Sequence, residues 1–137
     1  MRRPLSSLTL RRLGLACLGA IGLAACGMLD GSATHPGYVV FFSERSAVLE
    51  ADGASVVASA AAAARATPGA TVAVLGWTDS DGSPAADIKL SQQRAKTVAA
   101  ALVADGITAD RITRQGRGQT HDDPGVESRR VEIRIGS

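Results

Sequence analysis

The 137-residue sequence is poor in aromatic residues, cysteine and histidine, and each scarcity argues against a class of function. Four aromatic side chains are too few for a platform on which single-stranded nucleic acid stacks base by base. Two cysteines and two histidines argue against a Cys/His zinc site of the usual kind. Apolar residues make up 45% of the chain and charged residues 20%, which is typical of one folded domain.

No apolar run is long enough for a membrane-spanning helix, although a short one follows a basic start. Arginines at positions 2, 3, 11 and 12 precede the apolar run 13–25, as in a secretory signal. The run ends in Leu23-Ala24-Ala25-Cys26, which resembles the lipobox of bacterial lipoproteins. The resemblance implies cleavage before Cys26 and acylation of that cysteine with diacylglycerol and an amide-linked chain such as palmitate. An ordinary signal peptide cut after Ala25 is the alternative.

Cleavage before Cys26 changes the charge balance of the chain. The signal takes four of the fifteen Lys and Arg residues and none of the thirteen Asp and Glu residues, leaving a net charge of −2. A basic surface for nucleic acid is therefore not expected. Gly27, in place of an aspartate, implies by the same resemblance sorting to the periplasmic face of the outer membrane. We expect three parts: a signal peptide (1–25), a lipidated cysteine with a flexible Gly- and Ser-containing tether (26–37), and a folded domain (38–137).

The folded part alternates strand-like and helix-like segments. Buried or alternating apolar patterns predict strands at 38–42, 71–77, 111–116 and 131–135. Alanine-rich or amphipathic segments predict helices at 46–66 and 87–104. This order predicts an α+β, two-layer βαβαββ domain with two helices packed on one face of a small mixed sheet.

Two arginines interrupt apolar faces. Arg94 falls in the apolar stripe of the second helix, and Arg129 shares by parity the apolar face of the last strand. A buried guanidinium needs partners, and Asp79 and Asp81 in the loop after the second strand are the candidates. Periodicity leaves two interpretations open: a structural ion pair between Arg94 and Asp79, or a polar notch that a zwitterionic ligand completes.

Several motifs in order resemble the OmpA C-terminal-like domain, which occurs in OmpA, peptidoglycan-associated lipoproteins and flagellar-motor stators. They are Gly76-Trp77-Thr78-Asp79-Ser80-Asp81-Gly82, Leu90-Ser91-Gln92-Gln93-Arg94-Ala95-Lys96-Thr97-Val98, Gly106-Ile107, Arg111-Ile112, Gly116-Arg117-Gly118 and Arg129-Arg130-Val131-Glu132-Ile133. The resemblance covers residues 38–135. It implies non-covalent binding of the peptidoglycan stem peptide at meso-diaminopimelate, which would tether the outer membrane to the cell wall.

The resemblance also implies roles for individual residues. Asp79 matches the aspartate that receives the ammonium group of diaminopimelate, and Arg94 matches the arginine that receives its carboxylate. Thr78 and Ser80 flank Asp79 and would offer backbone donors, and Arg129 would brace the aspartate loop. Asp87 lies beside this expected pocket. A fixed pair of opposite charges suits a ligand that carries an ammonium and a carboxylate on one carbon.

The sequence also departs from the family. Asp87 and Ser128 replace asparagines, Ser43 and Arg45 stand where acidic residues are common, and residues 120–127 form a shortened loop. Trp77 stands where histidine is common, and core packing is its expected role. Asp87, Ser128 and the short loop motivate an alternative to peptidoglycan binding, in which an OmpA-like envelope protein has lost this binding and contacts a protein partner.

Signals for catalysis, metals and cofactors are weak. No Ser–His–Asp set is apparent, and His35 and His121 fall outside the predicted helices and strands. His121-Asp122-Asp123 lacks a fourth ligand, and Asp79-Ser80-Asp81-Gly82 lacks the later acidic ligands of a calcium loop. We therefore expect a binding protein that is not an enzyme and that has no metal, cofactor or nucleic-acid partner.

Overall fold

The computed structural model describes residues 37–80, 82–120 and 125–136, so the predicted signal peptide, Cys26 and all of the tether except Gly37 lie outside the described residues. The elements run β1 (Tyr38–Phe41), α1 (Ala51–Ala66), β2 (Thr71–Thr78), α2 (Pro84–Ala104), β3 (Ile112–Gln119) and β4 (Arg130–Gly136). Short 3-10 helices cover Ala109–Arg111 and Val126–Ser128. The predicted α+β class and βαβαββ order are confirmed.

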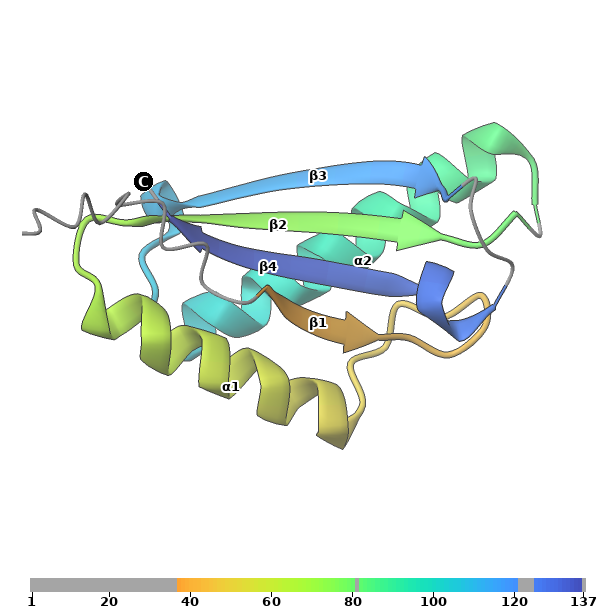
Figure 1. Cartoon of the computed structure of the whole chain (residues 1–137). Coiled ribbons are helices and arrows are strands. Elements are labelled where there is room, and N and C mark those ends of the chain that lie inside the picture. Colours follow the sequence, from red (N-terminus) through yellow and green to blue (C-terminus); the bar gives the residue numbers. More distant parts are fainter. Residues whose placement is uncertain (1–36, 81, 121–124, 137) are drawn as a thin grey trace, which may run out of the picture. The chain divides into compact units, whose positions relative to one another are not determined.

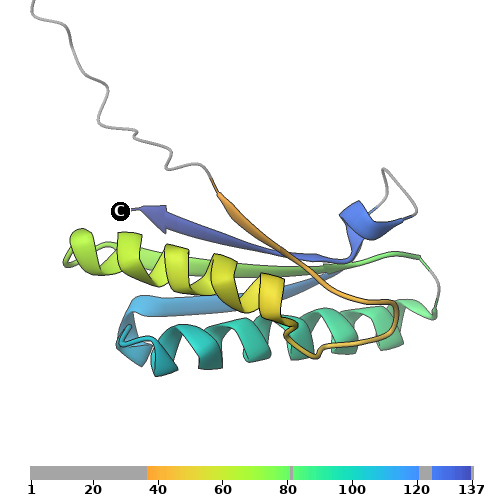
Figure 2. The same ribbon diagram turned by 90° about the horizontal axis from the view of Figure 1, so that it is seen from below.

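The four strands form one mixed sheet in the order β1-β4-β2-β3 (Figure 1). β2 pairs with β3 in parallel, and β4 lies antiparallel to both β1 and β2. Both helices lie on the same side of the sheet (Figure 2), as the sequence predicts, and no α-helix of the described residues covers the other face. No helix in the described part of the chain has the length and apolarity that a membrane crossing requires.

The core fills the space between the helices and the sheet. α1 contributes Val57 and small side chains such as Ala60, Ala61 and Ala64, all fully buried, so this helix can lie close to its neighbours. From the sheet, the buried valines and isoleucines of β2 and β4 contribute to the same core. All the buried apolar side chains of the core cluster come from residues 40–135, so a chain that begins at Gly27 contains this whole core.

Two glycines let α2 approach the sheet. Gly76 and Gly116 are neighbours across the β2–β3 pair. A methyl group at Gly76 would lie 2.2 Å from the main-chain oxygen of Ser91, and one at Gly116 would lie 2.6 Å from the main-chain nitrogen of Gln92. The Ser91 hydroxyl in turn accepts from the Gly118 N–H at 3.0 Å, which fixes the helix on β3. The glycines of the motifs therefore set the distance between the two layers.

Both helices begin at other residues than the sequence pattern indicates. α1 starts at Ala51 rather than at 46, because the carbonyls of Ser43, Ser46 and Ala47 accept hydrogen bonds from α2 side chains. α2 starts at Pro84 rather than at 87. Ser83 caps it by accepting from the Ala86 N–H, and proline is favoured in a first helical turn.

Candidate functional site: charged residues at the end of strand β2

Arg94 holds the loop between β1 and α1 onto the end of β2. Its side chain projects from α2 and is fully buried. Nε donates to the Ser46 carbonyl at 2.7 Å, Nη1 to the Trp77 carbonyl at 3.0 Å, and Nη2 to the Ser43 carbonyl at 3.1 Å. The guanidinium also lies 5.4 Å from the centre of the Phe42 ring. One charged side chain thus joins three segments that are far apart in sequence.

The electrostatic surroundings of Arg94 are mixed. Burial lowers the pKa of its guanidinium from the usual value, Asp79 opposes that shift, Arg129 adds to it, and Asp87 opposes it. Two cations and two anions therefore act on one another in this region.

Asp79 pairs with Arg129, which reaches it from the start of β4. Arg129 Nη1 lies 3.1 Å from Asp79 Oδ2, and Arg129 Nε donates to the Phe42 carbonyl at 3.3 Å. The side chain of Asp79 is 8% exposed, against 21% for Arg129. The alternative ion pair between Arg94 and Asp79 is wrong, because Arg94 donates to main-chain carbonyls instead. Asp81 lies outside the described residues.

The remaining predicted residues divide into buried and exposed ones. Thr78 is fully buried, and its hydroxyl has no hydrogen-bond partner among the described residues. Ser80 is exposed. Asp87 is buried in the first turn of α2, where the helix dipole favours a negative charge. It accepts a hydrogen bond from Gln119 Nε2 at the end of β3, a partner that no sequence signal indicates.

The loop before β4 is closed by side-chain contacts at its ends. Ser128 is buried and its hydroxyl accepts from the Thr120 hydroxyl at 2.5 Å. Residues 121–124 lie outside the described part, including the His121-Asp122-Asp123 run. In the parts of the chain that are described, no three His, Cys, Asp or Glu side chains gather closely enough to hold a metal ion.

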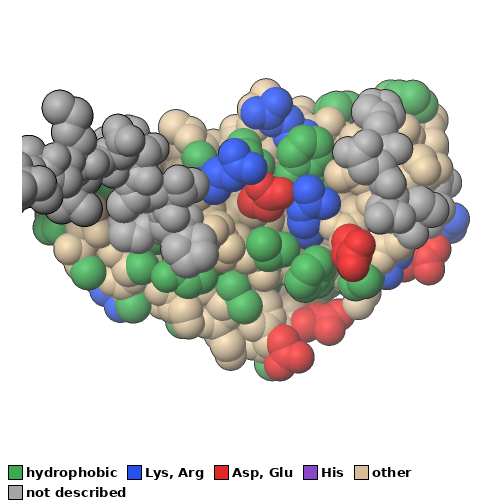
Figure 3. All heavy atoms as spheres, viewed as in Figure 1, with side chains coloured by type: hydrophobic (Ala, Val, Ile, Leu, Met, Phe, Trp, Pro, Cys, Tyr) green, Lys and Arg blue, Asp and Glu red, His purple; other side chains and the backbone are tan. Residues whose placement is uncertain are grey.

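Trp77 does not have the core position expected from the sequence. Its neighbours in β2, Gly76 and Thr78, are buried on the helix side, so Trp77 faces the open side of the sheet. There its ring lies between Arg130, at 5.5 Å, and Arg117, at 5.9 Å. Figure 3 shows Lys and Arg side chains gathered around an acidic one on this face, where Arg130 and Arg134 both pair with Glu132.

The fold and the site define a small two-layer α+β module with opposed charges at one end of its sheet. Residues 41–132 match the OmpA family, which is more than half of the chain. The chain therefore belongs to the OmpA family.

Curated relatives agree with this assignment. The probable lipoprotein YiaD of Escherichia coli is 37% identical over 103 residues, which are 70% of this chain and 47% of YiaD. Outer membrane protein A of Bordetella avium is 35% identical, over 69% of this chain and 53% of the relative. The peptidoglycan-binding protein ArfA of Mycobacterium bovis is 34% identical, over 74% of this chain and 33% of ArfA. The chain thus spans about half, or less, of the length of these relatives.

Solved structures share the fold. The peptidoglycan-associated lipoprotein of Burkholderia pseudomallei superposes with a TM-score of 0.66 at 21% identity, over 72% of this chain and 89% of that one. The C-terminal domain of MotB from Helicobacter pylori gives a TM-score of 0.63 at 22% identity, over 74% and 84% of the two chains.

Proposed function

We propose that this protein binds peptidoglycan non-covalently at the diaminopimelate of the stem peptide. Membership of the OmpA family supports the binding of cell wall, and one relative carries the name peptidoglycan-binding protein. Asp79 receives the ligand's ammonium group and Arg94 its carboxylate. The observation that carries this assignment is the Asp79–Arg129 ion pair at the end of β2, where the buried Arg94 donates to the Trp77 carbonyl.

Ligand binding at Arg94 requires a movement of the loop above it. Arg94 is fully buried and already donates to the carbonyls of Ser43 and Ser46. A carboxylate that replaces these carbonyls gives the guanidinium a charged acceptor in place of neutral ones, and adds the attraction of opposite charges to the hydrogen bonds. Residues 43–46 open and close on the ligand. The buried Thr78 hydroxyl, which lacks a partner among the described residues, gains one in the complex.

The protein acts from the outer membrane, to which acylated Cys26 anchors it on the periplasmic side. The Leu23-Ala24-Ala25-Cys26 motif and the similarity to a probable lipoprotein support this location. Several acyl chains hold a protein in a membrane almost permanently, at about 0.8 kcal/mol per buried methylene. Mass spectrometry of the membrane-extracted protein tests the anchor. An acylated N-terminal Cys26 is expected, and an unmodified mature chain contradicts it.

A second candidate is an envelope protein of the same fold that contacts a protein partner in place of the wall. The pairing of Asp79 with Arg129 and of Asp87 with Gln119 favours it, because these groups have partners within the chain. Both candidates are binding functions, and neither uses the site residues for catalysis.

An NMR titration of the chain from Gly27 onward separates the two candidates. A muropeptide containing diaminopimelate should give saturable shifts at residues 43–46, 78–80 and Arg94. A lysine-containing muropeptide lacks the side-chain carboxylate and should give none. Asp79→Asn keeps the size of the side chain and should abolish the shifts without unfolding the domain.

Arg111→Ala is the matched control for Arg94→Ala. It removes another arginine that donates to three main-chain carbonyls, at the opposite end of β2. If both variants lose muropeptide binding, the loss in Arg94→Ala is explained by a less stable fold and not by a missing ligand contact. Absence of shifts in the folded wild-type chain at millimolar muropeptide would favour the protein-partner function.

A further inference from the structure

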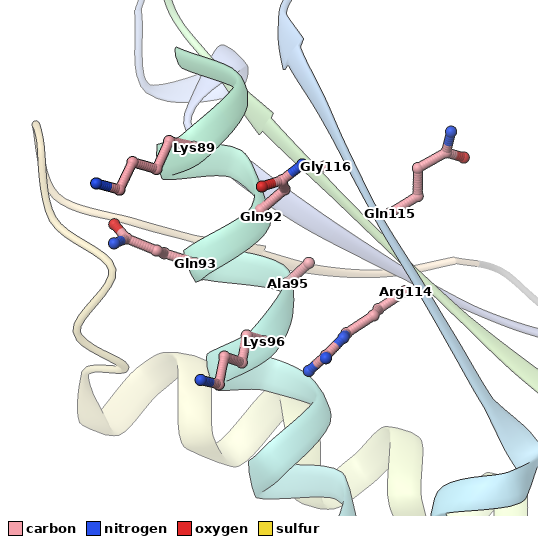
Figure 4. A pocket seen from close by; sticks show the side chains of 8 residues that line it. All are labelled: Lys89, Gln92, Gln93, Ala95, Lys96, Arg114, Gln115 and Gly116. Carbon is pink, nitrogen blue, oxygen red and sulfur yellow. The ribbon is translucent and has the colours of Figure 1, made fainter. Parts of the chain in front are cut away.

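A groove between α2 and β3 lies apart from the charged site. Two adjoining cavities, of about 450 and 380 Å³, share Lys96 and Arg114 in their linings. The first is also lined by Lys89, Gln92 and Gln93 (Figure 4), and the second by Ala99, Ala100, Val103, Ala109 and Ile112. From Lys89 to Val103 the helix rises by about 21 Å, at about 1.5 Å per residue.

The two halves of the groove differ in chemistry. Lys89, Lys96 and Arg114 give the first half positive charge, and the described residues that line both cavities include no Asp or Glu. Lys89, Gln93 and Lys96 project from one side of α2, while Arg114 extends from β3 towards the helix (Figure 4). Apart from the shared Lys96 and Arg114, the lining of the second half is alanine, valine and isoleucine, and Val103 is 46% exposed.

β3 adds a main-chain feature to the groove. The strand order places β3 at the edge of the sheet, so one side of its backbone has no neighbouring strand among the described residues. Thr113, Arg114 and Gln115 are all exposed along this edge. An edge strand can pair with an extended peptide, whose alternate side chains then enter pockets beside it.

We propose that the groove binds an extended polypeptide segment of a partner protein, which adds to the edge of β3. The segment is acidic where it meets Lys89, Lys96 and Arg114, and apolar where it meets Val103 and Ile112. The acidic half of the segment is inferred from charge complementarity with the Lys and Arg side chains of the groove. The apolar half favours a polypeptide over an anionic polymer, because a phosphate- or carboxylate-rich polymer offers nothing to bury against alanine and valine.

Designed peptides test this binding on the isotopically labelled chain from Gly27 onward. The probe is an eight-residue peptide that alternates Asp and Thr in one half and Val and Thr in the other, made in both chain directions. One orientation should give saturable NMR shifts at residues 89–103 and 112–117. Replacing each Asp by Lys should abolish binding, and replacing each Val by Ser should weaken it at least fivefold.

Variants of the protein locate the binding. Lys96→Glu should lower the affinity for the peptide at least tenfold. Arg134→Glu is the matched control, because it makes the same type of charge reversal on the open sheet face, and it should change the affinity less than twofold. Asp79→Asn should leave peptide binding intact, and Lys96→Glu should leave muropeptide binding intact, so failure at one site is distinguishable from failure at the other.

Three outcomes would overturn the inference. One is the absence of saturable shifts with either peptide up to millimolar concentration. Another is equal binding of the Val→Ser peptide or of inorganic polyphosphate, which would make the groove a general anion site. The third is concentration-dependent self-association in sedimentation velocity with the same residues shifted in the absence of peptide, which would make the occupant a second copy of the chain.

Discussion

Two arginines, at opposite ends of β2, each donate to main-chain carbonyls. The acidic side chains near Arg94 are buried, whereas Asp110 beside Arg111 is exposed. Arg94 joins Ser43, Ser46 and Trp77 at the end of β2. Arg111 donates to the carbonyls of Ala64, Thr67 and Ala70, and so holds the turn between α1 and the start of β2.

The difference between the two ends lies in burial and in the neighbouring charges. Arg94 is fully buried and interacts with the buried Asp79 and Asp87, whereas Arg111 is half-buried, donates to three carbonyls and interacts with the exposed Asp110. Holding a turn therefore needs only an arginine and three carbonyls. The buried acids at the Arg94 end are the groups that the proposed function assigns to ligand binding.

The largest effect is expected from Arg94→Ala. Three carbonyls lose their donor, so the free energy of unfolding should fall by about 3 kcal/mol, at about 1 kcal/mol for each acceptor. Urea denaturation followed by the fluorescence of Trp77, the single tryptophan, measures it. Arg94→Lys keeps the charge and should recover part of the loss. A loss of unfolding free energy below about 1 kcal/mol would contradict the conclusion that Arg94 anchors the β1–α1 loop to the end of β2.

Gly76→Ala should destabilise the same end of β2 by about 2–3 kcal/mol, because overpacking pushes the layers apart. The added methyl group would lie 2.2 Å from the Ser91 oxygen. Gly136→Ala is the control, since a methyl group there meets nothing within 4 Å. Equal urea midpoints for the two variants would contradict this prediction, because they would show that α2 can move away from the sheet with no loss of stability.

Arg111→Ala should cost about 1–2 kcal/mol, less than Arg94→Ala, because water can reach the freed carbonyls of a half-buried arginine. The same urea experiment compares the two variants directly. This variant should retain muropeptide binding, because Arg111 contacts the start of β2, at the opposite end of the strand from Asp79 and Arg94. Equal losses of stability in the two alanine variants would remove the contrast between the two ends.

The smallest effect concerns Arg130 and Arg134, which both pair with the carboxylate of Glu132. Burial alone would raise the pKa of Glu132, but hydrogen bonds from Arg130 and Arg134 outweigh it and lower that pKa. The folded-state pKa thus lies below the unfolded one. The resulting stability is complete above about pH 4.5 and is lost as the pH falls through the folded-state pKa.

Glu132→Gln measures this contribution. Because Arg134 is largely exposed, its ion pair with Glu132 contributes little. The free energy of unfolding of the wild type should therefore exceed that of the variant by less than about 1 kcal/mol at pH 7. The difference should shrink towards pH 3, in urea titrations at each pH. A difference in the free energy of unfolding that stays constant from pH 7 to pH 3 would contradict the lowered pKa of Glu132.

Much of the fold is readable from local patterns. The alternation Val131, Ile133, Ile135 identifies β4, and the alanines before Pro68 identify α1, since both patterns reflect one face meeting the core. The starts of the helices are less readable. Residues 46–50 have a helix-like composition, yet side chains of α2 donate to the carbonyls of Ser46 and Ala47, and those donors are distant in sequence.

The sequence by itself determined the α+β class, the order of the elements and the positions of Arg94 and Arg129 on apolar faces, because periodicity records which side of each element is buried. Only the tertiary structure decided how the charges are paired. Asp79 meets Arg129, Asp87 meets Gln119, and Arg94 meets carbonyls, since pairing depends on distances across the fold that no local pattern encodes.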